Sequence, residues 1–341
     1  MKRFLIAAAA TTAAANAALA GGIDRSGQPI AFMFENGTYA ELTYGYVAPS
    51  VQPAAFPLGD VTPNYSSFGL AYKRDLSDKL SIGVQLDQPF GAYVQYPPGA
   101  PLAGTYAELW SSSINVIGRY KFEGGFSAHA GLRYVTVDGR AFVPGRGVVA
   151  QSFSADADLG YLVGFAYEKP EIALRVALTY FSSTDHSLDS SVGTIGTIDP
   201  PQAVNLDFQT GIAANTLLFG QIRWVDWTNT TINIPPAVDP APLLSYADDR
   251  ISYSLGIGRK FNDNWSGAIT LGYEDAKGGL SSLLSPTDGY KSVGLGVTYT
   301  KDNLKVTGGI RYVEVGDAVT LIGPFTDNSA IGVGVKVGWS F

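Results

Sequence analysis

Residues able to do acid–base or nucleophilic chemistry are few in this chain. It contains two histidines, His129 and His186, and no cysteine. A hydrolase needs a nucleophile, a histidine and an orienting group within hydrogen-bond reach, and no local motif here provides them. The lack of cysteine excludes disulfides and thiolate metal sites. The sequence therefore predicts a protein that is not an enzyme and that needs no cofactor and no metal.

In the segments where apolar and polar residues alternate, charged residues fall at the positions between the large apolar ones, so they lie on one face of each predicted strand. They are Arg119, Arg133, Arg175, Arg223, Arg311, Lys336, Asp87, Asp207 and Glu41. Inside a narrow barrel, such charges can pair with each other and hold the wall rigid. Alternatively, some arginines bind a ligand carboxylate, which a guanidinium matches bidentately. The candidate ligand-binding arginines are Arg133, Arg175, Arg223 and Arg311, and both interpretations stay open.

These side chains need strands to position them, and the carboxyl-terminal segment shows the pattern best. From Ile331 to Phe341 every second residue is large and apolar, and the residues between are small or polar. This period of two predicts a strand with two unlike faces, long enough to cross a bilayer at a tilt. Similar alternation recurs from about Tyr39 onwards and gives about fourteen segments, an even number as in single-chain bacterial barrels.

The connections between these segments also alternate in kind. Short turns rich in Gly, Asn and Asp alternate with longer stretches. The predicted longer loops cover residues 50–63, 91–104, 139–152, 182–200, 228–247, 275–286 and 316–326. This pattern predicts an all-β fold, a membrane-spanning antiparallel β-barrel at residues 39–341 without an internal domain boundary.

The amino-terminal residues form two further parts. Residues 1–20 have a positive start, an Ala-rich apolar stretch and a small-x-small site at Ala18 to Ala20, which predicts a signal peptide. Residues 21–38 lack strand alternation and contain Phe32-Met33-Phe34. This segment is either a short plug inside the barrel or a disordered tail, and its apolar triplet favours burial. Export with no later helical anchor predicts the outer membrane of a Gram-negative bacterium.

One predicted strand contains a defect at Pro89-Phe90-Gly91. Proline removes a ladder donor and glycine relaxes the backbone, so the ladder is expected to break there. The break either ends the strand at the barrel rim or opens a gap in the wall through which an apolar ligand leaves sideways into lipid.

With these features, the chain resembles the FadL/TodX family of outer-membrane transporters for long-chain fatty acids and other hydrophobic compounds. The resemblance covers the mature chain and is based on the strand number, the amino-terminal segment, Asp87 to Gly91 and the aromatic carboxyl terminus. It implies a lumen closed by an amino-terminal hatch, with Phe32 and Phe34 packed into the lumen. It also implies ligand capture in the barrel and lateral exit at Pro89, Phe90 and Gly91.

The expected function is therefore passive transport of fatty acids or other hydrophobic small molecules. The alternative is a diffusion porin for small polar solutes, which the charged lumen residues keep open. The expected partners are a hydrophobic ligand, outer-membrane lipid and lipopolysaccharide, and the barrel-assembly machinery, which would read Phe341. The acidic net charge of −7 gives no indication of nucleic-acid binding, and a monomer is expected.

Overall fold

The computed structural model describes residues 22–55, 59–99, 102–234 and 241–341. The predicted signal peptide at residues 1–20 lies outside the described residues. No helix in the described part of the chain is long and apolar enough to cross a lipid bilayer.

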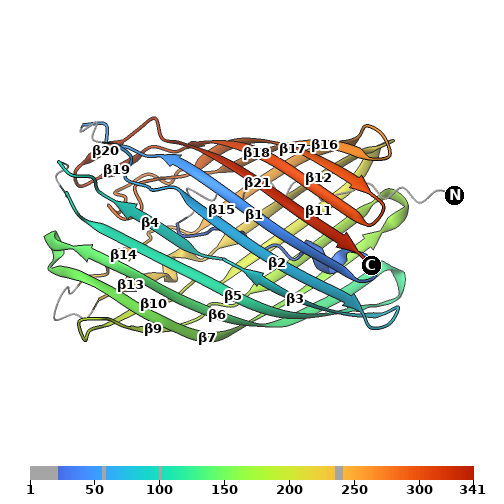
Figure 1. Cartoon of the computed structure of the whole chain (residues 1–341), viewed down its shortest axis with the longest axis horizontal. Helices are drawn as coiled ribbons and strands as arrows, with labels where there is room; N and C mark the ends of the chain where they lie inside the picture. The colour runs from blue at the N-terminus through green and yellow to red at the C-terminus, as the bar shows by residue number, and fades with distance from the viewer. Residues whose placement is uncertain (1–21, 56–58, 100–101, 235–240) are drawn as a thin grey trace.

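Tilted antiparallel strands form one closed barrel (Figure 1). The wall strands are β1 (Tyr39–Ser50), β2 (Tyr65–Asp75), β3 (Leu80–Asp87), β4 (Gly91–Gln95), β5 (Tyr106–Lys121), β6 (Phe126–Val143), β7 (Val148–Lys169), β8 (Leu174–Phe181), β11 (Ala203–Ala213), β12 (Thr216–Val225), β15 (Arg250–Lys260), β16 (Trp265–Glu274), β17 (Tyr290–Lys301), β18 (Leu304–Val315) and β21 (Ser329–Ser340). β3 and β4 are two halves of one wall strand, because both pair with β5. The described residues thus form a 14-stranded wall, which confirms the predicted fold class.

The first and last strands close the barrel. β1 pairs with β21 in a continuous antiparallel ladder from Tyr39 opposite Ser340 to Ser50 opposite Ser329. The start of β1 and the carboxyl terminus therefore lie at the same end, which we call the inner end (Figure 1). The opposite end, with the longer connections, is the outer end. Closure leaves the barrel without the free edges that make open sheets aggregate.

Side chains alternate between the two faces of the wall as the sequence predicts. On β5 every second residue from Trp110 to Tyr120 is exposed, and the residues between are buried inside the barrel. Large apolar side chains such as Leu42, Ile114 and Leu295 cover the outer face. Arg119, Arg133 and Arg223 lie on the inner face and are about 2% exposed. An apolar outside and a polar inside are typical of a barrel in a membrane.

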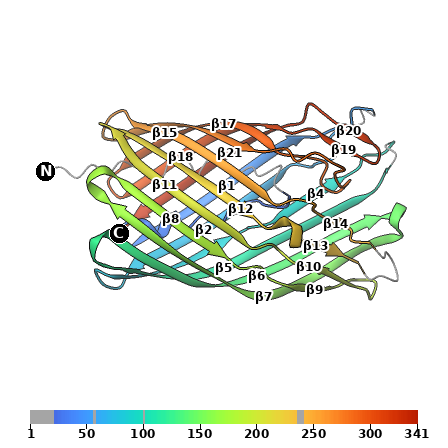
Figure 2. The same cartoon turned by 180° about the vertical axis from the view of Figure 1, so that it is seen from behind.

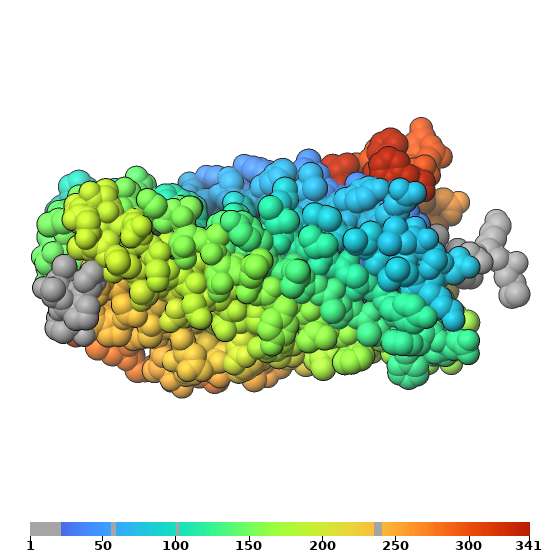
Figure 3. All heavy atoms as spheres, turned by 90° about the horizontal axis from the view of Figure 1, so that it is seen from below, coloured from blue at the N-terminus to red at the C-terminus, as the bar shows by residue number. Residues whose placement is uncertain are grey.

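Smaller elements build the outer end. β9 (His186–Asp189), β10 (Ile195–Ile198), β13 (Thr231–Asn233) and β14 (Leu244–Ser245) form a four-stranded sheet, and β19 (Ala318–Thr320) pairs with β20 (Gly323–Phe325). Two short 3₁₀ turns, η4 (Pro144–Arg146) and η6 (Trp227–Asn229), also lie at the outer end. η3 (Glu123–Gly125) and η5 (Pro170–Ile172) join wall strands at the inner end, and η2 (Ala31–Phe34) precedes β1. Figure 2 shows the labels of β9, β10, β13, β14, β19 and β20 together at the outer end, and in Figure 3 the same end lies on the left.

The predicted long loop at residues 139–152 is wrong. β6 continues to Val143 and β7 begins at Val148, so that only the η4 turn joins them. The strands extend because Val137, Val143 and Val148 point inward and are buried in the apolar cluster of the outer end. The predicted loop at residues 91–104 likewise contains β4. In both places strands continue into residues that were predicted as loops.

Candidate functional site

The wall is interrupted at the defect predicted from the sequence. Asp87 on β3 lies opposite Ser113, whereas Gly91 on β4 lies opposite Trp110. Three residues, 88–90, therefore face only residues 111–112 on β5, which is one extra residue, as in a β-bulge. Proline supplies no N–H at position 89, and the Ser111 hydroxyl lies 2.8 Å from both the N and the O of Phe90.

The bulge leaves a gap in the ladder on the other side of the strand. β2 pairs with β3 only from Leu70 to Asp75, and β4 pairs with β5 but not with β2. Residues 65–69 of β2 thus have no ladder partner on this side. One of their backbone groups is satisfied by a side chain, because Phe68 N–H donates to Gln88 Oε1 at 2.8 Å. We call this region, between residues 65–69 and 87–95, the wall gap.

Residues 22–38, the plug segment, lie inside the barrel and reach this gap. Asp24 forms an antiparallel bridge with Phe90. Arg25 N–H donates to Pro89 O, and Gly91 N–H donates to Ile23 O, both at 2.8 Å. The plug segment thus pairs through its backbone with the broken strand.

An ion pair anchors the plug segment across the lumen. Arg223 on β12 donates to Asp24 from Nε at 2.6 Å and from Nη2 at 3.2 Å. The same guanidinium donates to Gln28 Oε1 at 3.1 Å and to Asn205 Oδ1 at 2.8 Å. All of these groups are buried, so the pair forms where charge–charge interaction is poorly screened.

The apolar triplet of the plug segment is buried at its other end. Phe32 and Met33 are at most 1% exposed and pack on β3, where a Cβ added to Gly83 would lie 2.3 Å from Met33 Sδ. Phe34 lies between two guanidinium groups, with Arg119 Cζ at 4.3 Å and Arg175 Cζ at 4.7 Å from the ring centroid. Cations over an aromatic face attract its quadrupole.

The two remaining candidate arginines contact the wall. Arg133 donates to Ser182 O at 2.9 Å, and Arg311 donates to Ser292 Oγ at 2.7 Å. The structure therefore does not bring the four candidate arginines together in one pocket. Arg223 and Arg175 contact the plug segment, and Arg133 and Arg311 stabilise neighbouring strands.

An apolar cavity lies at the outer end, between β4 to β6 and the small four-stranded sheet. Including its open mouth, this outer cavity has a volume of about 610 Å³. Its lining is mostly aliphatic and includes Leu188, Ile198, Ile232, Ile234, Leu244 and Leu284. The charged lining residues, Glu108 and Arg140, are paired with each other at 2.6 Å. The outer cavity therefore favours an apolar molecule.

Three buried side chains belong to the same apolar cluster as the lining of the outer cavity. They are Ile23 of the plug segment, Phe90 of the broken strand and Trp227 of η6. The Phe90 and Trp227 rings meet edge to face at 6.3 Å. We call these three residues the apolar seal.

Asp226 positions the tryptophan of the seal. Its carboxylate accepts hydrogen bonds from Gln202 at 2.7 Å and from Asn229 at 2.8 Å. Burial by itself raises the pKa of Asp226, but these bonds and that from Thr228 outweigh it and lower the pKa below its ordinary value. The ionised carboxylate thus orders the start of η6.

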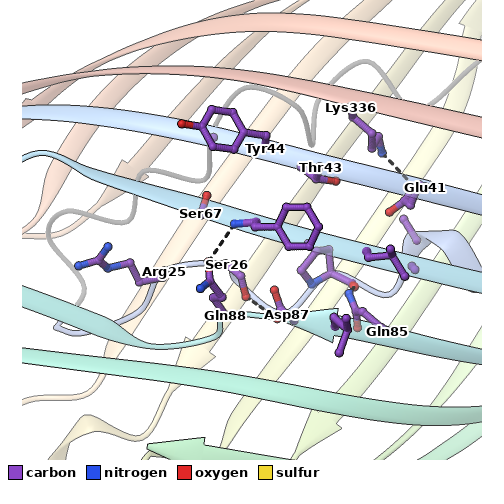
Figure 4. Close-up of a pocket in the computed structure, with 18 residues that line it drawn as sticks. Arg25, Ser26, Glu41, Thr43, Tyr44, Ser67, Gln85, Asp87, Gln88 and Lys336 are labelled. Carbon is purple, nitrogen blue, oxygen red and sulfur yellow. Dashed lines mark hydrogen bonds and ion pairs between the residues drawn. The ribbon is translucent and has the colours of Figure 1, made fainter. Parts of the chain in front are cut away.

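A second cavity lies at the wall gap, and we call it the wall cavity (Figure 4). With its open part it has a volume of about 740 Å³, between the plug segment and β1 to β3. Arg25, Ser26, Gln85, Gln88 and Thr43 give it a polar lining, whereas Phe68, Leu70 and Leu86 belong to the outer, lipid-type face. The lining of the wall cavity thus includes residues from both faces of the wall.

The histidines do not form an accessible catalytic group. His129 Nε2 lies 2.9 Å from Thr179 Oγ1, and His186 Nε2 lies 3.0 Å from Thr184 Oγ1. All four residues are buried. Among the described residues, no three His, Asp or Glu side chains gather in a way that could hold a metal ion.

Sequence reasoning missed three residues at this site, Asp24, Arg25 and Trp227, and it gave the side chain of Gln88 no role within the Asp87 to Gly91 defect. Asp24 and Arg25 lie in a segment without periodicity, so no pattern gives the direction of their side chains. Gln88 precedes the proline that was recognised, and its amide compensates for a ladder bond that this proline disrupts. Trp227 lies just after the inward-facing Val225, and this position offered a weak signal for burial.

No protein-family model matches this sequence, and neither does any curated protein. Solved structures do match. A FadL homologue of Pseudomonas aeruginosa is 13% identical with a TM-score of 0.76, covering 97% of this chain and 98% of that chain. The toluene transporter TodX of Pseudomonas putida is 14% identical with a TM-score of 0.68, covering 96% of each chain.

The toluene transporter TbuX of Ralstonia pickettii is also similar. It is 12% identical with a TM-score of 0.65, covering 90% of each chain. At these identities the likeness shows the fold alone. The resemblance read from the sequence is confirmed at that level: this chain has the fold of the FadL and TodX outer-membrane barrels.

Proposed function

We propose that this protein is a passive outer-membrane transporter for hydrophobic small molecules such as long-chain fatty acids, and not an enzyme. One observation carries the proposal: the apolar cluster next to the outer cavity includes Ile23 of the plug segment and Phe90 of the broken strand, and the wall gap lies at that same broken strand. An apolar molecule gains roughly 25 cal/mol for each Å² of apolar surface that leaves water in the outer cavity. It then passes Ile23, Phe90 and Trp227 and leaves through the wall gap into lipid.

The proposed orientation places the outer end outside a Gram-negative cell and the inner end in the periplasm. Lipid and lipopolysaccharide would surround the apolar outer face. The exposed Phe341, next to Trp339, would be read by the barrel-assembly machinery. We retain a monomer as the proposed state.

The polar-solute porin is the weaker alternative. It needs a continuous wet lumen with facing charges. Here Asp24 of the plug segment pairs with Arg223, and Phe34 packs against Arg119 and Arg175. These are the lumen arginines that would line such a pore. The polar wall cavity is the feature that still favours this alternative.

Uptake of labelled oleate by a Gram-negative host without its own fatty-acid transporter tests the proposal. The decisive variant is deletion of Pro89, which removes the extra residue and lets β3 and β4 pair with both neighbours. We expect the intact protein to support uptake and the deletion to abolish it. Deletion of Gly279, which lies in the irregular connection between β16 and β17 and outside the wall ladders, is the matched control.

Folding of each variant is checked by heat-modifiable gel mobility. Uptake that survives the Pro89 deletion would overturn lateral exit. Folded protein that takes up no oleate but conducts ions steadily in a planar bilayer would overturn the transporter and favour the porin.

A further inference from the structure

The wall gap is occupied by a side chain that does not belong to the wall. Arg25 of the plug segment lies between the ribbons of β2 and β4 (Figure 4). Its Nε donates to Gly91 O at 2.8 Å, and its Cζ lies 3.6 Å from the centroid of the Tyr65 ring. The guanidinium thus bridges the two strands that the ladder fails to join.

Gly91 makes room for this arrangement. A Cβ at position 91 would lie 3.1 Å from Arg25 Nε and 3.2 Å from Leu109 O. The glycine of the predicted defect therefore does more than relax the backbone, because any side chain there would compete with Arg25 for the gap.

Arg25 differs from Arg223 and Lys73, two other cations that lie at the plug segment. Within the described part of the chain, Arg223 and Lys73 each form an ion pair, but none joins Arg25 to a carboxylate. A guanidinium held by one carbonyl and one aromatic ring is released at lower cost than one held in a buried ion pair.

A second side chain closes the middle of the gap. Gln88 extends from the bulge to Phe68 on β2 and accepts its N–H at 2.8 Å (Figure 4). The side-chain amide of Gln88 thus replaces a backbone hydrogen bond of the ladder. Unlike a backbone carbonyl, it can swing away without unfolding either strand.

We propose that Arg25 and Gln88 are the two closing residues of the lateral gap, and that Arg25 withdraws with the plug segment when the gap opens. This inference builds on the proposed function and names the closure of its exit. Gln88 keeps β2 paired in the closed state, and Arg25 fills the space between Tyr65 on β2 and Gly91 on β4. The state of the plug segment is thereby coupled to that of the wall.

Cysteine accessibility tests the closure without any transport assay. The chain has no cysteine, so Ser67→Cys places a single thiol on β2 at the wall cavity. The protein is placed in lipid nanodiscs and labelled with a maleimide that dissolves in the bilayer. We expect Arg25→Ala to raise the labelling rate roughly tenfold, as loss of one cation–π contact and one hydrogen bond implies.

Conservative variants separate the two roles. Arg25→Lys keeps the charge but loses the planar stack on Tyr65, so its rate should lie between those of the parent and Arg25→Ala. Gln88→Ala should raise the rate, whereas Gln88→Glu keeps an oxygen acceptor for Phe68 N–H and should not. The matched control is Arg74→Ala, which removes an exposed arginine of β2, the strand that carries the thiol at position 67.

Equal labelling in the parent and in both alanine variants would overturn the closure. So would an equal rise with Arg74→Ala, since the effect would then not depend on the gap. If Arg25→Ala does not fold, Arg25→Gln gives the same comparison. If labelling responds as expected but the protein takes up no oleate, the proposal that Arg25 and Gln88 close the gap stands and the proposed transport function is rejected.

Discussion

The two halves of the plug segment are held in the barrel by different kinds of contact. Residues 22–28 are held mainly by directional polar contacts: the Asp24–Arg223 pair, backbone bonds to the broken strand, and Asn205 Nδ2 donating to Gly27 O at 2.8 Å. Ile23 adds apolar packing in the seal. Residues 29–38 are held mainly by packing, with Phe32 and Met33 against β3 and the Phe34 ring against two guanidinium groups. Gln85 Nε2 also donates to Pro29 O at 2.8 Å. Lys73 also donates to Glu35 O at 2.7 Å.

This difference indicates which half can move. Polar contacts can be exchanged for water or for a ligand, whereas close packing on a glycine is lost only when the segment separates from the wall. The boundary coincides with two left-handed residues, Gly27 at φ 66° and Gln28 at φ 53°. The half that lies beside the gap is thus the half whose contacts are exchangeable.

The largest expected effect comes from Asp24→Ala, which leaves Arg223 buried without its partner. Loss of one member of a buried pair costs about 3–5 kcal/mol, which corresponds to a roughly hundredfold or greater rise in exposure. A thiol at Ser26→Cys should therefore be labelled much faster, and one at Ala31→Cys should not change. Asp24→Asn, which retains an acceptor, should have a smaller effect. A rise at both positions together would show that the halves move as one.

Gly83→Val should have the opposite pattern and a smaller effect. Its first added carbon would lie 2.3 Å from Met33 Sδ and 2.7 Å from Phe32 Cε2. Overpacking of this kind costs about 1–3 kcal/mol. Labelling at Ala31→Cys should rise while that at Ser26→Cys stays nearly constant. The control is Gly308→Val, because an added Cβ at Gly308 would meet no atom within 4 Å; if it has the same effect, packing of the plug segment is not the cause.

Phe34→Leu should have the smallest effect of the three. It removes the aromatic face between Arg119 and Arg175 but retains apolar volume, at a cost of about 1–2 kcal/mol. Urea unfolding in lipid vesicles, followed by tryptophan fluorescence, should show a corresponding fall in stability. Phe34→Tyr keeps the ring and should stay close to the parent. Equal losses of stability in Phe34→Leu and Phe34→Tyr would show that the cation–π contacts do not contribute.

Much of the wall was predictable because alternation is a local property. Each strand has an inner and an outer set of side chains, so the inward position of Arg119 and Arg223 follows from their place in the sequence. Pro89 and Gly91 also give local signals, and the ladder is interrupted between them.

The partners of the lumen residues were not predictable in this way. Arg223 meets Asp24, which lies 199 positions away in the chain, and no periodicity relates the two. The plug segment has no regular structure apart from η2, so the direction of each side chain depends on the complete barrel. For the same reason the role of Arg25 was not predicted, although the defect at Pro89 to Gly91, where its side chain lies, was predicted.

The pairing of the first strand with the last bears on how the molecule assembles. The β1–β21 ladder forms only after the whole chain is available, and joining such distant segments is entropically costly and slow. The plug segment is joined directly to β1, so it lies beside the strand that takes part in this final step. A plug segment packed on β3 before the seam forms is enclosed by the closing wall. One that packs later must enter through the inner mouth. In the first order of events, the filling of the lumen and the completion of the wall belong to a single folding event.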